Sequence, residues 1–424
     1  MIRVLSGTVA SRVLVTFFNF LTIAVAAQAL GKEGIGVISL ILLGITIIML
    51  LNNLVGGAAI VYLVPRLGAR SLLLPSYIWA LVTAMIFYGV IHFVELVPER
   101  YSFHVLALAF IQSIYTVHFN ILIGREQIKV FNIITVVQAV IIFVVFDVML
   151  HVMNEPDPKS YVWALYAAYG TGLIASIFAI RKHLGEEKAI NPFQAFGRIV
   201  RYGAFTQAAN VLQQLNYRLS YYIIEFYSGL GALGIYSIGT QLSEGAWITS
   251  KSMSMVQYAR ISNTEDLKKN RVLTIAFVKL GVVFTLAVMT ILIILPGSVY
   301  TWVFGPEIVG LRTIMLLLCP GVLAMAASMM FSHFFSGTGA HHHNAIGSGI
   351  GLVVTLIAGF TLIPEHGSLG AALTASFSYC TLTLYKGIVF LKLSKASFLE
   401  ILPSASDVRI ARSEWKKFRD HRSK

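Results

Sequence analysis

Apolar residues in this chain are gathered in runs of about 20 to 25, the length that a helix needs to cross roughly 30 Å of hydrocarbon. In hydrocarbon, only helices and closed β-barrels satisfy their backbone polar groups. The runs are continuous and lack the strict alternation of barrel strands, which excludes a barrel. Charged residues make up only 12% of the 424 residues. The sequence therefore predicts an all-α polytopic membrane protein.

The runs predict about twelve membrane spans. They are residues 8–30, 36–64, 72–94, 103–124, 128–150, 161–181, 203–227, 231–257, 272–296, 309–335, 343–363 and 368–391. Ala26-Ala27-Gln28-Ala29 resembles a signal-peptide cleavage site. Arg12 interrupts the apolar region that such a peptide would need, so we expect the first span to be retained.

The formal charge of +13 is explained by membrane topology and does not indicate a nucleic-acid partner. With the N-terminus inside, 23 of the 32 Lys and Arg fall on the cytoplasmic side of the predicted spans. Only Lys32, Arg100 and Lys159 fall outside. This positive-inside asymmetry predicts that both termini are cytoplasmic.

A short phrase occurs twice, two hundred residues apart. Leu30-Gly31-Lys32-Glu33-Gly34-Ile35-Gly36-Val37-Ile38 returns as Leu230-Gly231-Ala232-Leu233-Gly234-Ile235-Tyr236-Ser237-Ile238. Each copy lies between two long apolar segments. Duplicated halves around a central path are typical of secondary transporters. With an even number of spans in each half, we predict a parallel repeat of two six-helix bundles.

The polar segment around Asn191-Pro192 marks the expected boundary between the bundles. We predict an N-terminal six-helix bundle at 1–182, a cytoplasmic linker at 183–202, a C-terminal six-helix bundle at 203–391 and a tail at 392–424. Helical spacing of apolar residues among basic ones predicts that the tail lies on the inner leaflet as an amphipathic helix, and a solvated tail is the alternative. The predicted outer loops are too short for a soluble catalytic domain, so we do not expect an enzyme.

Polar residues form a stripe along the seventh span, where they recur every three or four residues and so share one helix face. They are Gln207, Asn210, Gln214, Arg218, Tyr221 and Glu225. Span one carries a matching face with Thr8, Arg12, Thr16 and Asn19, and span eight one with Ser237, Gln241, Glu244 and Lys251. A water-filled path through the membrane, lined by these polar faces, explains stripes of this length better than helix packing does.

The depths of Arg218 and Glu244 along their helices differ by about 6 Å, at roughly 1.5 Å per residue. We therefore predict an ion pair or a water-bridged contact between them. Lys279 is a further candidate for the path, whereas Lys386 and Arg312 are expected to extend to the inner and outer membrane surfaces.

The predicted substrate path has a surplus of cations, which favours an anionic cargo; the alternative is that these cations hold helices together. The path residues are Arg12, Asn19, Gln207, Asn210, Gln214, Arg218, Glu244, Lys251, Lys279 and Arg312. No catalytic or metal site is expected: His341-His342-His343 lacks further ligands, Cys319 and Cys380 lie within apolar spans, and no phosphate-binding loop is present.

Three motifs resemble the oligosaccharide (polysaccharide) flippase family, the Wzx-like branch of the MOP superfamily that also contains the MATE exporters. They are Ala29-Leu30-Gly31-Lys32-Glu33-Gly34-Ile35-Gly36, Gly231-Ala232-Leu233-Gly234-Ile235-Tyr236-Ser237 and Ile363-Pro364-Glu365-His366-Gly367-Ser368-Leu369-Gly370-Ala371-Ala372-Leu373. Their order and the span count extend the likeness over the whole chain. One departure is the His tract, where the family often has a basic inner loop before span eleven.

The resemblance implies a V-shaped pair of bundles in a bacterial inner membrane. It implies a cargo of oligosaccharide on undecaprenyl pyrophosphate, such as an O-antigen unit, flipped from the cytoplasmic to the periplasmic leaflet. No cofactor is expected beyond a coupling ion, Na⁺ or H⁺. Membrane lipids and a polysaccharide polymerase or chain-length regulator are the expected partners. The alternatives are a MATE-type exporter, a lipid II flippase, which commonly has two additional spans, and a membrane glycosyltransferase or polymerase.

Overall fold

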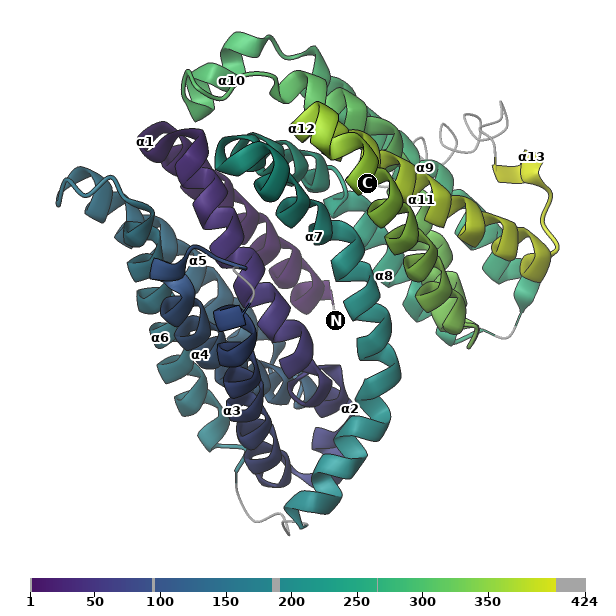
Figure 1. The fold of residues 1–424 in the computed structure, drawn as a ribbon. Coiled ribbons are helices and arrows are strands. Elements are labelled where there is room, and N and C mark those ends of the chain that lie inside the picture. Colours follow the sequence, from purple (N-terminus) through teal and green to yellow (C-terminus); the bar gives the residue numbers. More distant parts are fainter. Residues whose placement is uncertain (1, 94–95, 185–190, 265, 402–424) are drawn as a thin grey trace, which may run out of the picture.

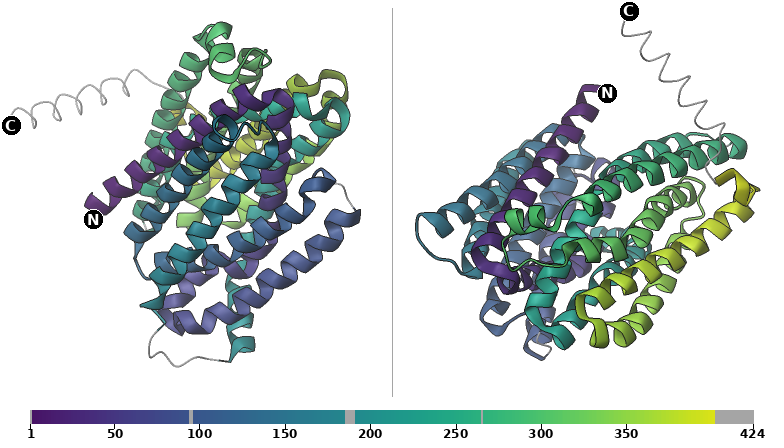
Figure 2. Two further views of the ribbon diagram at one scale, coloured as in Figure 1. Left: turned by 90° about the vertical axis from the view of Figure 1, so that its left-hand side faces the viewer. Right: turned by 90° about the horizontal axis from the view of Figure 1, so that it is seen from above.

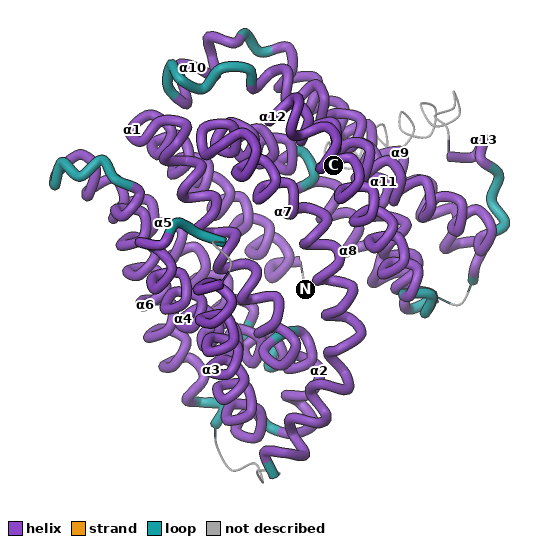
Figure 3. The backbone as a smooth tube through the Cα atoms, viewed as in Figure 1, coloured by secondary structure: helices purple, strands orange, loops and turns teal. Residues whose placement is uncertain are grey.

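The computed structural model describes residues 2–93, 96–184, 191–264 and 266–401. These residues form helices and short connections, with no strand among them (Figure 3). The helices are α1 Ile2–Gly56, α2 Ala58–Leu67, α3 Ala69–Phe93, α4 Glu99–Gly124, α5 Ile128–His151, α6 Pro158–Arg181, α7 Pro192–Gly245, α8 Ile248–Ser262, α9 Leu267–Ile294, α10 Gly297–Phe304, α11 Leu311–Gly337, α12 His342–Ser394 and α13 Phe398–Ile401. The protein is an all-α polytopic membrane protein, as predicted.

Three of the helices are long enough to hold two spans each, because the chain reverses within them at a single glycine. The glycines are Gly31 (φ 66°) in α1, Gly229 (φ 79°) in α7 and Gly367 (φ 53°) in α12. Residues with a side chain rarely adopt such positive φ angles. The expected outer loops at these three places are therefore sharp kinks with almost no loop.

The predicted number of about twelve spans is confirmed. The kinked helices α1, α7 and α12 supply two spans each, with α2 and α8 continuing the second span of α1 and of α7. Single spans are formed by α3, α4, α5, α6, α9 and α11. By length and composition, eight helices among the described residues can cross a membrane. Helix α7 is not among these eight, because its mean hydropathy is lower. Its polar stripe explains the difference.

The structure differs from the prediction at two places, the start of α7 and the loop after span nine. Helix α7 begins at Pro192, within the expected linker, because the Asn191 side chain caps it by accepting the Phe193 N–H at 2.9 Å and Pro favours the first helical position. The expected outer loop after span nine contains the short helix α10. Most of the predicted amphipathic tail, residues 402–424, lies outside the described residues.

The helices form two groups, which we call the N-terminal lobe (α1–α6) and the C-terminal lobe (α7–α13). Figure 1 shows the purple and blue helices on one side and the green and yellow helices on the other, and the view from above in Figure 2 separates them in the same way. This arrangement agrees with the predicted pair of bundles, and the boundary residues between them stay a prediction. We call the end with the three kinks and α10 the kink end, and the opposite end, where α7 and α9 begin, the termini end.

Helix α7 is the main connection between the lobes. Near the termini end, the Tyr62 and Tyr202 rings lie 4.8 Å apart, which joins α2 to α7. The Trp79 and Phe196 rings, 5.9 Å apart, join α3 to α7 in the same way. The beginning of α7 therefore packs against the N-terminal lobe, while its later part belongs to the C-terminal lobe (Figure 1).

Candidate functional site

A cavity of about 320 Å³ lies between the first span of α1 and the segment where α7 gives way to α8. We call it the interlobe cavity. It is lined by Thr16, Asn19, Phe20, Ile23, Ile238, Gln241, Leu242, Glu244, Gly245, Ile248 and Phe304. These positions recur every three or four residues on α1 and on α7–α8, so each helix presents one face to the cavity.

A second cavity, of about 250 Å³, extends from the same place into the N-terminal lobe. It is lined by Asn19, Thr22, Ile23, Ala26, Ile35, Ile38, Ser39, Leu42, Ile142, Tyr161, Leu165, Tyr169 and Gln241. Asn19, Ile23 and Gln241 line both cavities. The two amide side chains therefore stand where the cavities meet.

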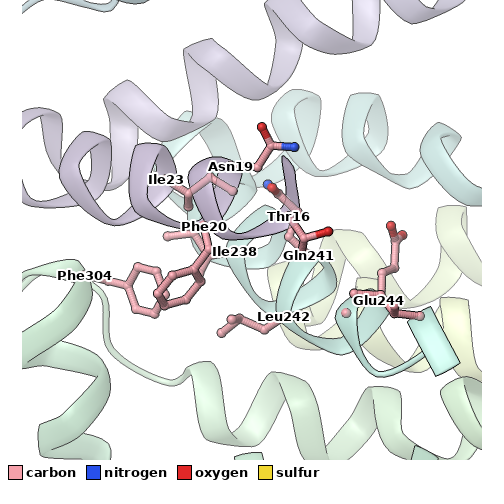
Figure 4. A pocket seen from close by; sticks show the side chains of 11 residues that line it. Thr16, Asn19, Phe20, Ile23, Ile238, Gln241, Leu242, Glu244 and Phe304 are labelled. Atoms are coloured by element: carbon pink, nitrogen blue, oxygen red, sulfur yellow. The ribbon is translucent and has the colours of Figure 1, made fainter. Parts of the chain in front are cut away.

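The interlobe cavity is amphipathic. Figure 4 shows the polar groups of Asn19, Gln241 and Glu244 on one side of the view and the rings of Phe20 and Phe304 on the other. The two rings lie 5.9 Å apart, at 81° to each other. A molecule with a polar head and an apolar part would find partners for both in this space.

The predicted contact between Arg218 and Glu244 is confirmed. Arg218 Nη2 lies 3.0 Å from Glu244 Oε2, and the two side chains are 27% and 25% exposed. Arg218 Nη1 also donates to the Tyr221 hydroxyl at 2.8 Å, and that hydroxyl lies 2.9 Å from the hydroxyl of Thr240. Glu244 lines the interlobe cavity. The wall of the cavity therefore carries a carboxylate whose charge is balanced by Arg218.

Aromatic packing behind the ion pair holds this part of α7 and α8 against α11 and α12. The rings of Tyr217, Trp247 and Tyr379 lie 5.5 to 6.2 Å from one another. Trp247 Nε1 donates to the Val322 carbonyl at 3.0 Å, at the loosened turn between α7 and α8. The cavity wall formed by Gln241 and Glu244 is thus fixed by the C-terminal lobe.

Arg12 and Lys251 extend the two cavity faces toward the termini end. Arg12 precedes Thr16 by about one turn on α1, and Lys251 follows Glu244 by about two turns on α8. Both side chains are exposed. The predicted path therefore has an exposed cation on each of its two opposing helices.

Gln207 lies in a packed contact between the lobes, with the exposed Asn210 beside it. Gln207 is buried, and its Nε2 donates to the Leu50 carbonyl of α1 at 2.7 Å. Asn210 Nδ2 donates to Gln207 Oε1 at 3.4 Å. The stripe on α7 is therefore shared between packing near the termini end and the Arg218 ion pair further along, with half-buried Gln214 between them.

Three other intramembrane cations lie apart from the cavity linings. Arg312 is exposed at the start of α11, and Lys279 is half-buried in α9. The prediction that Lys386 extends to the inner membrane surface is wrong, because its side chain is only 3% exposed. Its Nζ donates to Ser332 Oγ at 2.9 Å and to Ser328 Oγ at 3.3 Å, both on α11.

Sequence reasoning missed the aromatic lining of the site. Phe304 lies on α10, in a segment expected to be a loop, and Tyr161 and Tyr169 lie in an apolar run without any distinguishing pattern. For Phe20, the i to i+4 spacing from Thr16 on the polar face of span one was an available signal. No signal of this kind existed for the residues of α10.

The interlobe cavity is closed at the kink end by contacts between the lobes. Gln28 Nε2, on α1, donates to the carbonyls of Val303 at 2.9 Å and Trp302 at 3.2 Å, on α10. The two repeated motifs also meet there. A Cβ on Gly36 would lie 2.2 Å from the Leu230 carbonyl oxygen, and one on Gly234 would lie 1.9 Å from that of Lys32.

No family model and no curated protein matches this chain. Its fold is similar to those of solved membrane transporters. The lipid II flippase MurJ in its inward closed conformation has a TM-score of 0.76 at 16% identity, covering 95% of this chain and 89% of that one. An inward-facing multidrug resistance MATE family transporter of the MOP superfamily has 0.72 at 15%, covering 90% and 96%. The outward-facing conformation of such a MATE family transporter has 0.64 at 15%, covering 93% and 96%.

Proposed function

We propose that this protein is an alternating-access flippase in a bacterial inner membrane, with both termini in the cytoplasm. Its cargo is an oligosaccharide on undecaprenyl pyrophosphate, such as an O-antigen or related repeat unit. It moves this cargo from the cytoplasmic to the periplasmic leaflet. The observation that carries the proposal is an amphipathic cavity between two duplicated lobes, with exposed cations along its approach.

The lining of the cavity suits the parts of this cargo. Sugar hydroxyls need amide and hydroxyl partners, which Thr16, Asn19 and Gln241 provide. A pyrophosphate needs cations, and Arg12 and Lys251 flank the path from the termini end. The aromatic rings of Phe20 and Phe304 offer apolar surface beside the polar groups.

The balance of charge separates this proposal from a drug exporter. Along the path, Arg12, Arg218 and Lys251 are positive, and Glu244 is the acid that pairs with Arg218. Like charge would repel an organic cation, the cargo of the MATE-type alternative. A negatively charged headgroup would instead be attracted toward the cavity.

A lipid II flippase is the second candidate, and the similarity to MurJ favours it. Lipid II and lipid-linked oligosaccharides share a polyprenyl pyrophosphate, so the same cations and amides would serve both. The two cargoes differ in their sugars and in the peptide that lipid II carries. Competition between the two lipids for the purified protein would therefore distinguish the candidates.

The test is a deletion of the gene followed by complementation. We expect undecaprenyl-linked glycan to accumulate in the inner leaflet, and the wild-type gene to restore its export. Asn19→Leu with Gln241→Leu should fail to restore export, whereas Arg312→Gln, outside both cavity linings, should succeed. A deletion that altered only drug tolerance, or one that blocked peptidoglycan synthesis instead, would contradict the proposal.

A further inference from the structure

Lys386 is a buried amine in the C-terminal lobe that the path described above does not use. It lies on the last span of α12, and its side chain is 3% exposed. Burial of a charged ammonium in a membrane protein is costly unless an opposite charge or water compensates it. The groups around Lys386 therefore decide which protonation state this conformation accepts.

The surrounding helices supply no counter-charge to Lys386 among the described residues. The membrane-embedded charged residues of α8 and α9 are themselves cations, Lys251 and Lys279. On α11 the neighbouring titratable group is His333, and on the first span of α12 it is His343, whose Nδ1 lies 2.9 Å from the Tyr385 hydroxyl. The acid of α12, Glu365, is near the kink at Gly367, and the acid of α13, Glu400, pairs with Arg271 at 3.1 Å.

The hydrogen bonds of Lys386 are those that suit a neutral amine. The Ser332 hydroxyl donates its hydrogen to the Ser328 carbonyl at 2.8 Å, so Ser332 Oγ can only accept from Nζ. Nζ also donates to the Ser328 hydroxyl oxygen at 3.3 Å, so the two serine acceptors match the two N–H donors of a neutral amine. An ammonium would have three N–H donors, and the described residues offer Nζ no third acceptor.

Close packing surrounds the aliphatic stem of Lys386. A Cβ on Gly347, on the neighbouring span of α12, would lie 2.8 Å from Lys386 Cε. The aliphatic stem of the lysine thus fills the space that this glycine leaves. Because the side chain is only 3% exposed, a movement of α12 against α11 would bring water, and with it a proton, to Nζ.

We propose that Lys386 is the proton-binding site that couples the protonmotive force to alternating access. The amine is neutral in the conformation described here, with the kink end closed, and takes up one proton in a conformation that hydrates it. This inference rests on the proposed transport function and identifies its coupling ion as H⁺. Lys386 is separate from the residues that line the cargo cavity.

The test follows the conformation of the purified full-length protein in nanodiscs, without cargo, as a function of pH. Spin labels at Lys129→Cys and Lys268→Cys, in a background of Cys319→Ser and Cys380→Ser, report the distance between the two lobes at the termini end. For coupling to one proton, the ratio of the two conformations should change by up to about tenfold per pH unit. The closed-kink conformation should be favoured at high pH.

Lys386→Met should abolish this pH dependence and hold the conformation seen here, since the thioether side chain is always neutral. Lys392→Met, an exposed lysine on the same helix, should titrate like the wild type. Pronounced pH dependence that persisted in Lys386→Met would overturn the proposal.

Ser332→Ala provides a milder variant in case Lys386→Met does not fold. Loss of the acceptor disfavours the closed form, so its midpoint should move to higher pH while the one-proton slope remains. An unchanged midpoint would also contradict the proposal. Since no cargo is present, this experiment can fail while the export assay succeeds, and the reverse also holds.

Discussion

Arg218 and Glu244 join the two spans of α7 by an ion pair at the wall of the interlobe cavity. Their helical depths, counted from the turn between two spans, placed them within reach, and their side chains meet at 3.0 Å. Depth alone could not place Gln207, which shares the same stripe but lies in the packed contact with α1. Which side of a stripe faces a cavity depends on the neighbouring helix, and this is a property of the tertiary structure.

Removing one partner of the Arg218–Glu244 pair should destabilise the protein more than removing both. Glu244→Ala leaves a guanidinium without its counter-charge in a partly buried site, so we expect a loss of about 2 kcal/mol in the free energy of unfolding. Arg218→Met combined with Glu244→Met should lose less, because no charge is stranded. Denaturant unfolding in detergent measures both. A double variant less stable than Glu244→Ala would show that the pair itself carries the stability.

At the scale of elements, glycines shape this molecule in two ways. Gly31, Gly229 and Gly367 allow the sharp reversals within α1, α7 and α12. The repeated motif was recognisable in the sequence as two copies, but it gave no indication that the copies touch. In the structure, Gly36 and Gly234 let the two copies approach until backbone meets backbone.

Substitution in this glycine contact should open the kink end. A methyl group in Gly36→Ala or Gly234→Ala would overlap a backbone carbonyl that cannot rotate away, so we expect a loss of about 1 to 3 kcal/mol and a larger population of the open kink end. Thermal unfolding and label distances across the kink end measure these effects. Gly349→Ala is the matched control, because a Cβ there meets nothing within 4 Å. Equal stability in all three variants would argue against the contact.

Helix α10 should act as a cover over the interlobe cavity. Gln28→Ala removes the bonds to the Trp302 and Val303 carbonyls, so Asn19→Cys should react faster with a membrane-impermeant maleimide added from outside. Thr361→Ala is the control, since that hydroxyl bonds only within its own helix. If Gln28→Ala gave no change in labelling rate, the cover would be held by other contacts.

At the scale of the whole molecule, two lobes meet through α1 and α7 and leave cavities on one side of that contact. The kink end is closed in this conformation, and both inward conformations in the comparison have higher TM-scores than the outward one. The contacts of Gln28, Gly36 and Gly234 would have to separate for the opposite end to become the closed one. These residues are therefore the places where an alternating-access movement should be measured.

The membrane topology gives a direct test at this scale. We expect single cysteines at Lys32 and Lys159 to react with an impermeant reagent in intact cells, and those at Lys129 and Lys268 to react only after permeabilisation. The twelve spans place the two pairs at opposite ends of the molecule. Labelling of Lys129→Cys in intact cells would contradict the orientation that the charge asymmetry predicts and would indicate the opposite one.

The sequence by itself determined the all-helical membrane fold, the number of spans and the repeated halves. These depend on local properties, the length of apolar runs and the spacing along a helix, which each segment carries with it. Only the tertiary structure decided which polar faces enclose a cavity, that α10 covers it, and that Lys386 is buried between α11 and α12. Those features depend on how closely segments distant in the chain approach, and glycines and small side chains on the partner helix set that distance.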